Sequence, residues 1–119
     1  MKMTGAKLIA AERQRQQAIE GYSEKRDEQY HNRELSRAAL GYLNHYVARG
    51  WTFANELEMP GIVDGPATYR GESVPDSWPW GDEYWKPKDP INDLIRAGAL
   101  IAAEIDRLQR KANAEPSNV

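Results

Sequence analysis

The chain has 119 residues, no cysteine and a formal net charge of −2, with 16 Lys and Arg against 18 Asp and Glu. This balance argues against a protein that binds duplex nucleic acid, because such proteins carry a clear basic excess. The lack of cysteine excludes disulfides, thiolate zinc sites and cysteine nucleophiles, and it favours a reducing cytoplasm. No apolar run approaches the roughly 18 residues that span a bilayer. We therefore expect a single cytoplasmic domain over residues 1–119, without a membrane partner.

Two segments in the first half of the chain show helical spacing of apolar residues. The first covers residues 4 to about 20, where one side carries Leu8, Ile9, Glu12 and Ile19. The second begins near residues 27–32 and runs to 49. Its stripe at intervals of three and four residues consists of Leu35, Ala38, Ala39, Tyr42, Leu43 and Tyr46.

A third helix is predicted from Asp89-Pro90, a capping residue followed by proline at the first helical position, through Leu108 or slightly beyond. A helix this apolar must touch neighbours on more than one side, so we expect it to be the central element. A frayed tail is expected over residues 113–119. The wide apolar arc of the third predicted helix comprises Ile91, Leu94, Ile95, Ala97, Ile101, Ala102, Ile105 and Leu108.

Residues 50–89 are rich in Trp and Pro, and we expect them to form a long flap between the second and third helices. Long connections in compact domains are usually functional or disordered. Trp78, Trp80 and Trp85 favour order, because large rings gain roughly 1.5–3 kcal/mol each from burial. The sequence thus predicts a mostly α, three-helix domain whose flap packs across the helices, with a short hairpin near residues 62–69.

Several polar groups near the flap and the helix ends fit a small anionic, nucleotide-like ligand. A helix start, nearby lysines and flat rings offer charge for a phosphate and a face for a base. Most other arginines, such as Arg37 and Arg96, are assigned to intramolecular pairs. The predicted ligand-binding residues are Arg13, Arg15, Glu20, His31, Trp80, Trp85, Lys86 and Lys88.

Three further residues are expected to be structural. Glu12 lies in the stripe of the first helix and Glu104 at the edge of the third helix's arc, and a half-buried carboxylate requires a partner. Both glutamates end a Leu-Ile-Ala-Ala-Glu segment, which is too short to indicate a duplication. Trp78 is expected to roof the core.

An acidic cluster opens the second predicted helix. If that helix has begun by Asp27, then Asp27, His31 and Glu34 share one flank, an arrangement that suits Mg²⁺ or Mn²⁺. The alternative interpretation is that these residues are the solvent-exposed, mixed-charge start of a helix and bind no metal. No phosphate loop, zinc-knuckle spacing or nucleophile motif is present, so covalent catalysis is not expected.

The chain resembles a widespread group of small proteins of tailed phages and prophages over roughly residues 7–110. The resemblance rests on Glu12-Arg13-Gln14-Arg15-Gln16, Glu20-Gly21-Tyr22, Asp27-Glu28 with His31, Glu34-Leu35, Trp78-Pro79-Trp80, Trp85-Lys86-Pro87 and the stretch 93–108. The resemblance implies no particular activity. It implies a phage-type accessory protein in a bacterial cytoplasm, where nucleotide metabolism and counter-defence are common tasks.

Two alternative functions stay open at this point. A looser likeness to all-α nucleoside triphosphate pyrophosphohydrolases implies a Mg²⁺-dependent enzyme with Asp27, His31 and Glu34 as metal ligands, although the doubled-glutamate motif of that family is missing here. The other alternative is an inhibitor that binds a host protein, or a homo-oligomer, through exposed aromatic residues. In the leading hypothesis the protein binds or sequesters its ligand without a cofactor.

Overall fold

The computed structural model describes residues 3–18, 27–49 and 73–114. Within these residues the chain forms three α-helices, α1 (Gly5–Ala18), α3 (Glu34–Arg49) and α6 (Pro90–Ala114), one short 3-10 helix, η1 (Asp82–Tyr84), and no strand. The predicted mostly α, three-helix domain is confirmed. The hairpin predicted near residues 62–69 lies outside the described residues.

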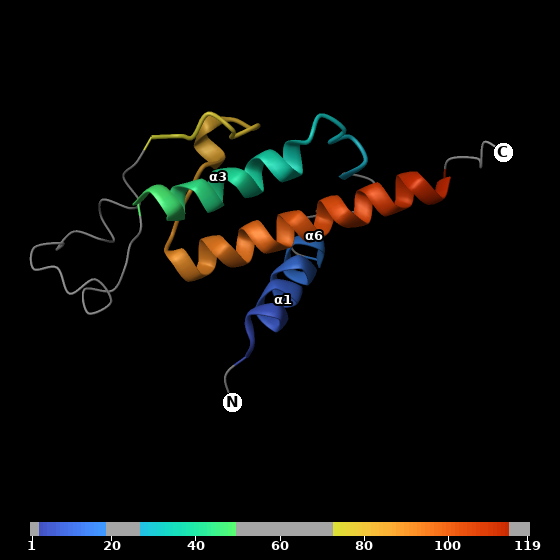
Figure 1. Ribbon diagram of the computed structural model, residues 1–119, viewed down its shortest axis with the longest axis horizontal. Helices are drawn as coiled ribbons and strands as arrows, with labels where there is room; N and C mark the ends of the chain where they lie inside the picture. Colours follow the sequence, from blue (N-terminus) through green and yellow to red (C-terminus); the bar gives the residue numbers. More distant parts are fainter. Residues whose placement is uncertain (1–2, 19–26, 50–72, 115–119) are drawn as a thin grey trace, which may run out of the picture.

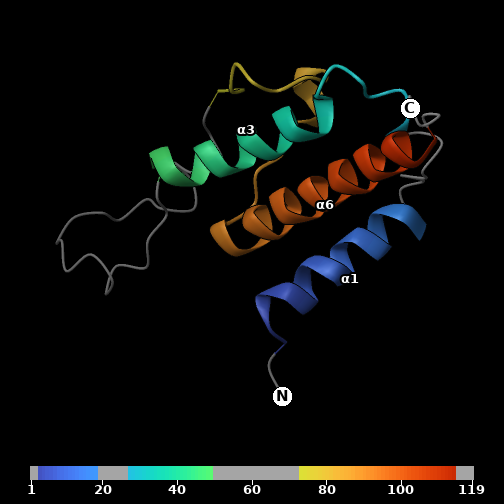
Figure 2. The same cartoon turned by 45° about the vertical axis from the view of Figure 1, so that its right-hand side comes forward.

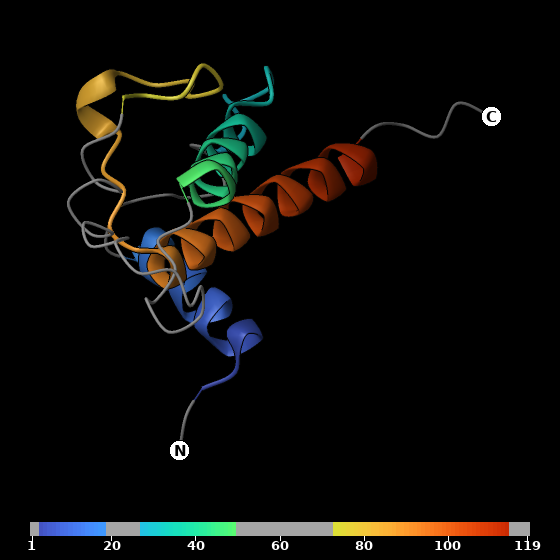
Figure 3. The ribbon, with the colours of Figure 1, turned by 60° about the vertical axis from the view of Figure 1, so that its left-hand side comes forward.

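Helix α6 is the central element, as predicted. It contacts α3 along one side and α1 along another, and the described parts of α1 and α3 do not contact each other. Figures 1 and 2 show α3 and α6 side by side and antiparallel, and Figure 2 shows α1 on the side of α6 away from α3, at a steeper angle in Figure 1; we call these three helices the helix layer. In Figure 3 the described part of the flap, residues 73–89, lies over α3, and α1 lies at the opposite edge of the layer.

The start of α6 is fixed by two aspartates. The Asp89 carboxylate accepts the backbone N–H of Asn92 at 2.8 Å, and Pro90 takes the first helical position, where no N–H is needed. The Asp93 carboxylate is 0% exposed and accepts the backbone N–H of Lys88 at 3.1 and 3.2 Å. The end of α6 lies at Ala114, so the first residues of the predicted tail are helical.

Helix α3 begins later than predicted. Arg33 has a φ of 64°, in the left-handed region, which interrupts a right-handed helix. The Glu34 carboxylate accepts the backbone N–H of Asn32 at 2.7 Å, so the chain turns sharply into α3. Residues 28–33 therefore form turns rather than the first turns of the helix.

The described part of the flap, residues 73–89, is held on α3 by aromatic packing, as predicted, and the rest of the predicted flap lies outside the described residues. Trp78 and Trp85 are buried and lie 5.6 and 5.0 Å from the ring of Tyr42. His45 is also buried, edge-on to Trp85 at 5.3 Å. Gly41 allows this close approach, because a Cβ there would lie 3.3 Å from Pro75 Cγ.

Two expectations about buried side chains are wrong. The side chains of α1 that become buried are Arg13 and Gln16, while Leu8 and Ile9 are only half-buried. This follows from where α1 docks, since Gly98 of α6 receives Ile9 and Arg13 pairs with Asp27. Several predicted core residues are also exposed, namely Leu43, Ile91, Ile101, Ile105 and Leu108.

Candidate ligand-binding cavity

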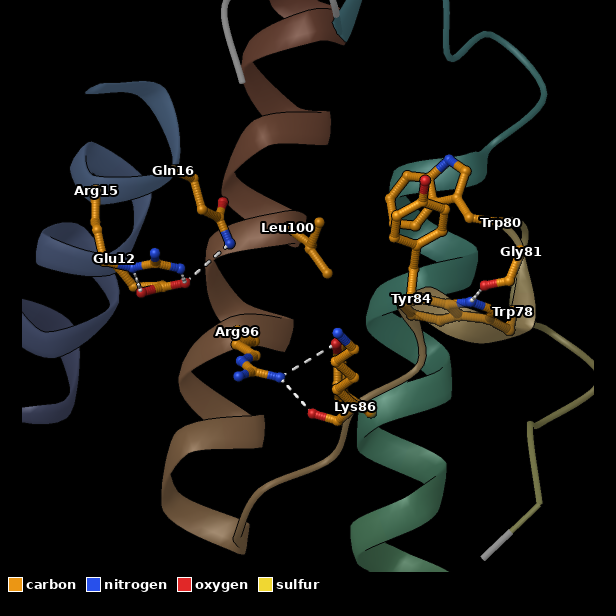
Figure 4. A pocket seen from close by; sticks show the side chains of 11 residues that line it. Glu12, Arg15, Gln16, Trp78, Trp80, Gly81, Tyr84, Lys86, Arg96 and Leu100 are labelled. Carbon is orange, nitrogen blue, oxygen red and sulfur yellow. Dashed lines mark hydrogen bonds and ion pairs between the residues drawn. The ribbon is translucent and has the colours of Figure 1, made fainter. Parts of the chain in front are cut away.

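A cavity of about 490 Å³ opens between α1, α6 and the flap (Figure 4). Ligand sites in proteins typically have volumes of roughly 300–1,000 Å³. Helix α1 forms one wall, η1 and its neighbours form the opposite wall, and α6 with Tyr42 of α3 forms the floor. The lining residues are Glu12, Arg15, Gln16, Tyr42, Trp78, Trp80, Gly81, Tyr84, Lys86, Arg96 and Leu100.

The lining carries a positive charge although the chain as a whole is acidic. Three cations, Arg15, Lys86 and Arg96, stand against one carboxylate, Glu12, which leaves a net charge of +2 on the lining. The whole chain has a net charge of −2. A concentration of positive charge in a concave surface favours an anionic ligand.

Arg96 is positioned by contacts from two other elements. Its Nη1 donates to the backbone carbonyl of Lys86 at 2.8 Å and to the hydroxyl of Tyr42 at 3.4 Å. The guanidinium also lies over the Tyr42 ring, 5.6 Å from its centre, and Nη1 is 3.9 Å from Asp93 Oδ1. Arg96 therefore joins α6 to both the flap and α3 at the floor of the cavity.

Glu12 and Arg15 form a bidentate ion pair in the α1 wall of the cavity. Arg15 Nε and Nη2 each donate to a carboxylate oxygen of Glu12 at 2.7 Å, and Gln16 Nε2 donates to Glu12 at 3.2 Å. The hydrogen bond from Arg15 lowers the pKa of Glu12, and the charges of Arg15 and Arg96 and the bond from Gln16 act in the same direction. Desolvation raises the pKa of Glu12, but by less than these interactions together lower it.

The flap supplies an aromatic wall. Trp78 Nε1 donates to the carbonyl of Gly81 at 3.1 Å, which fixes the turn into η1. Trp80 packs edge-on against Trp78 and Tyr30. Tyr84 is exposed at the mouth, and Figure 4 shows Tyr84 and Trp80 across the cavity from Glu12 and Arg15. The two walls thus offer charge on one side and aromatic rings on the other.

A second hollow of about 310 Å³ adjoins the first on the α1 side. It shares Glu12, Arg15 and Arg96 with the main cavity and adds Lys88. Asn92 and Ile95 of α6 complete its lining. The positive region therefore extends from Lys86 past Arg96 to Lys88.

The structure brings together some of the predicted ligand-binding residues. Arg15, Trp80 and Lys86 line the cavity, and Lys88 lines the neighbouring hollow. The start of α6 was predicted to offer free backbone N–H groups to a phosphate, but the N–H groups of Asn92 and Asp93 bond to Asp89 instead.

The remaining predicted ligand-binding residues lie elsewhere or outside the described residues. Arg13 is buried against Asp27 at 3.1 Å, and Trp85 is buried in the aromatic cluster on α3. His31 is exposed in the turn before α3, and Glu20 lies outside the described residues.

Arg96 and Tyr84 are the main residues that sequence reasoning missed. Arg96 was assigned to an intramolecular pair, and its partner is in part a backbone carbonyl that no sequence pattern indicates. The sequence offered one signal for Tyr84, because this residue directly precedes Trp85 and Lys86, which were predicted to bind the ligand. Gln16 was likewise missed, because a glutamine gives no pattern of its own.

The predicted metal ligands are not arranged on one helical flank. Because α3 starts at Glu34, Asp27 and His31 both precede it, His31 lies in a turn, and Asp27 is ion-paired with Arg13. Among residues 3–18, 27–49 and 73–114, no group of three or more His, Asp or Glu side chains is placed to hold a metal ion.

The expected partners of the two structural glutamates are present. Glu12 pairs with Arg15, and Glu104 pairs with Arg107, each three residues further along its helix. Ser36 of α3 also donates to Glu104 at 3.4 Å, and the hydrogen bond with Glu104 raises the pKa of Arg107. Trp78 is buried in the core, as expected.

Comparisons with known proteins give no assignment. Protein-family models, curated proteins and solved structures contain no match to this chain. The resemblance to small proteins of tailed phages therefore stays a prediction. None of the described helices combines the length and the apolar character that crossing a bilayer requires.

Proposed function

We propose that the protein binds a small anionic, nucleotide-like ligand in the cavity between α1, α6 and the flap, and sequesters it without changing it chemically. The observation that carries this proposal is the net positive lining of an aromatic-walled cavity in an acidic chain. Phosphate would lie toward Arg15 and Arg96, because guanidinium groups bind phosphate through paired hydrogen bonds. The base would lie on the opposite wall, against Trp80 and Tyr84.

The arrangement of Arg96 supports binding without large rearrangement. Its contacts with Lys86 and Tyr42 hold the guanidinium at the floor before any ligand arrives. Preorganised groups lose less conformational entropy on binding. Withdrawal of a signalling nucleotide by such a site would suit the phage-type accessory role that the sequence resemblance implies.

Calorimetric titration tests this proposal with nucleoside mono-, di- and triphosphates and cyclic dinucleotides, after native mass spectrometry of the purified protein. We expect at least one nucleotide to bind with a 1:1 stoichiometry. Arg96→Leu should weaken that binding at least tenfold, and Arg37→Leu, which removes an exposed arginine of α3, should leave it unchanged. No binding across the panel, or equal effects of the two variants, would refute the proposal.

A product analysis separates binding from the enzyme alternative. The protein is incubated with each nucleoside triphosphate and Mg²⁺ or Mn²⁺, and the nucleotides are then identified by mass spectrometry. Sequestration predicts that the nucleotide is recovered intact. Release of pyrophosphate that is lost in Asp27→Asn or Glu34→Gln would establish the pyrophosphohydrolase instead.

A further inference from the structure

A row of aliphatic side chains lies exposed on the helix layer, away from the cavity. We call these residues the apolar face. Six of them are between 41% and 70% exposed, and the seventh, Leu94, is half-buried. The face consists of Leu40, Leu43 and Val47 of α3, and Leu94, Ile101, Ile105 and Leu108 of α6.

These side chains share one side of the α3–α6 pair. At about 100° per residue, the α3 members fall within an arc of about 60°, and so do the α6 members. Gly41 and Tyr42 meet the flap on the other side of α3, and Arg96 and Leu100 line the cavity on the corresponding side of α6.

One contact shows that the two arcs adjoin. Ser36 lies within the α3 arc and donates to Glu104, which borders the arc of α6. Because α3 and α6 run antiparallel, both arcs then turn to the same surface of the layer. The apolar face is therefore the back of the helix layer, and the flap and cavity occupy its front.

The size of the apolar face matches an interface. From their exposed fractions, the seven side chains present on the order of 500 Å² of apolar surface, at the upper end for a monomer. A standard interface buries about 800 Å² per partner, of which an apolar core and a polar rim each form part. The apolar face has the area of such a core.

We propose that a second copy of this chain covers the apolar face, so that the protein is a symmetric dimer. All seven side chains are uncharged, so two copies can meet around a two-fold axis without like-charge repulsion. The described part of the flap covers the front of the described helices, whereas the apolar side chains at their back are exposed, and an apolar face of a helix layer is normally buried against another layer. Two antiparallel α3–α6 pairs would supply both layers of a four-helix arrangement. This inference is independent of the ligand in the cavity.

The oligomeric state in solution tests the proposal directly. At tens of micromolar, analytical ultracentrifugation should give twice the 13.5 kDa mass of the chain. Leu43→Glu and Ile101→Glu should each give the monomer mass with an unchanged helical circular-dichroism signal. Tyr84→Glu is the matched control, since it places the same charge at an exposed apolar site on the front of the layer, and it should remain dimeric.

A cysteine experiment gives a second readout that does not depend on a disruptive charge. The chain has no cysteine, so Ile101→Cys introduces a single thiol into the apolar face. A bifunctional thiol cross-linker should join two Ile101→Cys chains efficiently and two Tyr84→Cys chains poorly. Cross-linking at equal efficiency in both variants would contradict the proposed face.

Two outcomes would overturn the dimer. The first is a monomer mass for the native protein at every concentration up to several hundred micromolar. The second is a dimer that Leu43→Glu and Ile101→Glu leave intact. In the first case, destabilisation by the glutamate variants would assign the face to another segment of the same chain, and binding to lipid vesicles through the face would assign it to a membrane.

Discussion

Arg15 holds the carboxylate of Glu12 through two hydrogen bonds of 2.7 Å, so one cation of the cavity is already neutralised before a ligand binds. A phosphate that enters must share Arg15 with Glu12 or displace it. We therefore expect the ion pair to limit the affinity of the proposed site for anions.

We expect Glu12→Gln to strengthen the binding of ATP, used here as the anionic probe, by about threefold to tenfold. The substitution removes the one carboxylate of the lining, which raises the net positive charge that a phosphate meets and removes its competitor for the Arg15 guanidinium. Calorimetry at low and high salt measures the change, which should shrink as salt rises. Glu28→Gln is the control, because it removes a carboxylate from the exposed ion pair with Arg110 and should not alter binding.

Glu12 also makes stability depend on pH. Since its folded-state pKa lies below the ordinary value of about 4.5, the unfolded state binds more protons near that pH. The contribution of Glu12 is thus complete above about pH 4.5 and is lost as the pH falls through the lowered pKa. Urea unfolding from pH 7 to 3 should show a smaller loss of stability in Glu12→Gln than in the native protein, and parallel curves would contradict the prediction.

Arg13 and Asp27 form a buried ion pair between α1 and the segment before α3. Arg13→Leu leaves the Asp27 carboxylate in a buried site without this partner, so we expect a loss of about 3 kcal/mol in the free energy of unfolding. The double variant Arg13→Leu with Asp27→Leu should lose less, since the buried Asp27 carboxylate is removed together with its guanidinium partner. Arg37→Leu, on the exposed side of α3, should change stability by less than about 0.5 kcal/mol.

Gly41 sets how closely the flap approaches α3. A Cβ at this position would lie 3.3, 3.4 and 3.5 Å from Pro75, Ser77 and Trp85, and the further methyl groups of valine have no space there. We expect Gly41→Val to destabilise the protein by about 1–3 kcal/mol through overpacking. NMR spectra should show the largest shifts at Trp78 and Trp85. Gly5→Val is the control, because nothing lies within 4 Å of its Cβ position.

The fold was predictable where a local pattern determines the structure. The spacing of Leu35, Ala38 and Ala39 predicted the buried side of α3, and Asp89-Pro90 predicted the start of α6. The start of α3 was not predictable, because it depends on the left-handed backbone of Arg33, which arginine rarely adopts. Ile101 and Ile105 were expected in the core because they are apolar, but both are exposed. Hydropathy alone does not show whether another element packs against an apolar side of a helix.

The candidate site was predictable in composition but not in arrangement. The flap motif with Trp80 and Lys86 indicated an aromatic and basic region, and both residues line the cavity. Their pairing with Arg15 depends on how α1 crosses α6 near Gly98, which is a property of packing between distant segments. Arg13 and Arg15 are equally basic, and only the docking direction of α1 turns Arg13 inward and Arg15 to the cavity.

The placement of the indole rings gives the protein an optical reporter of its own. Trp78 and Trp80 line the cavity, and Trp85 lies 5.0 Å from Trp78, close enough for excitation energy to pass between the rings. A nucleobase stacked on Trp80 would quench emission from the whole cluster, so intrinsic fluorescence can follow occupancy of the cavity without any added label.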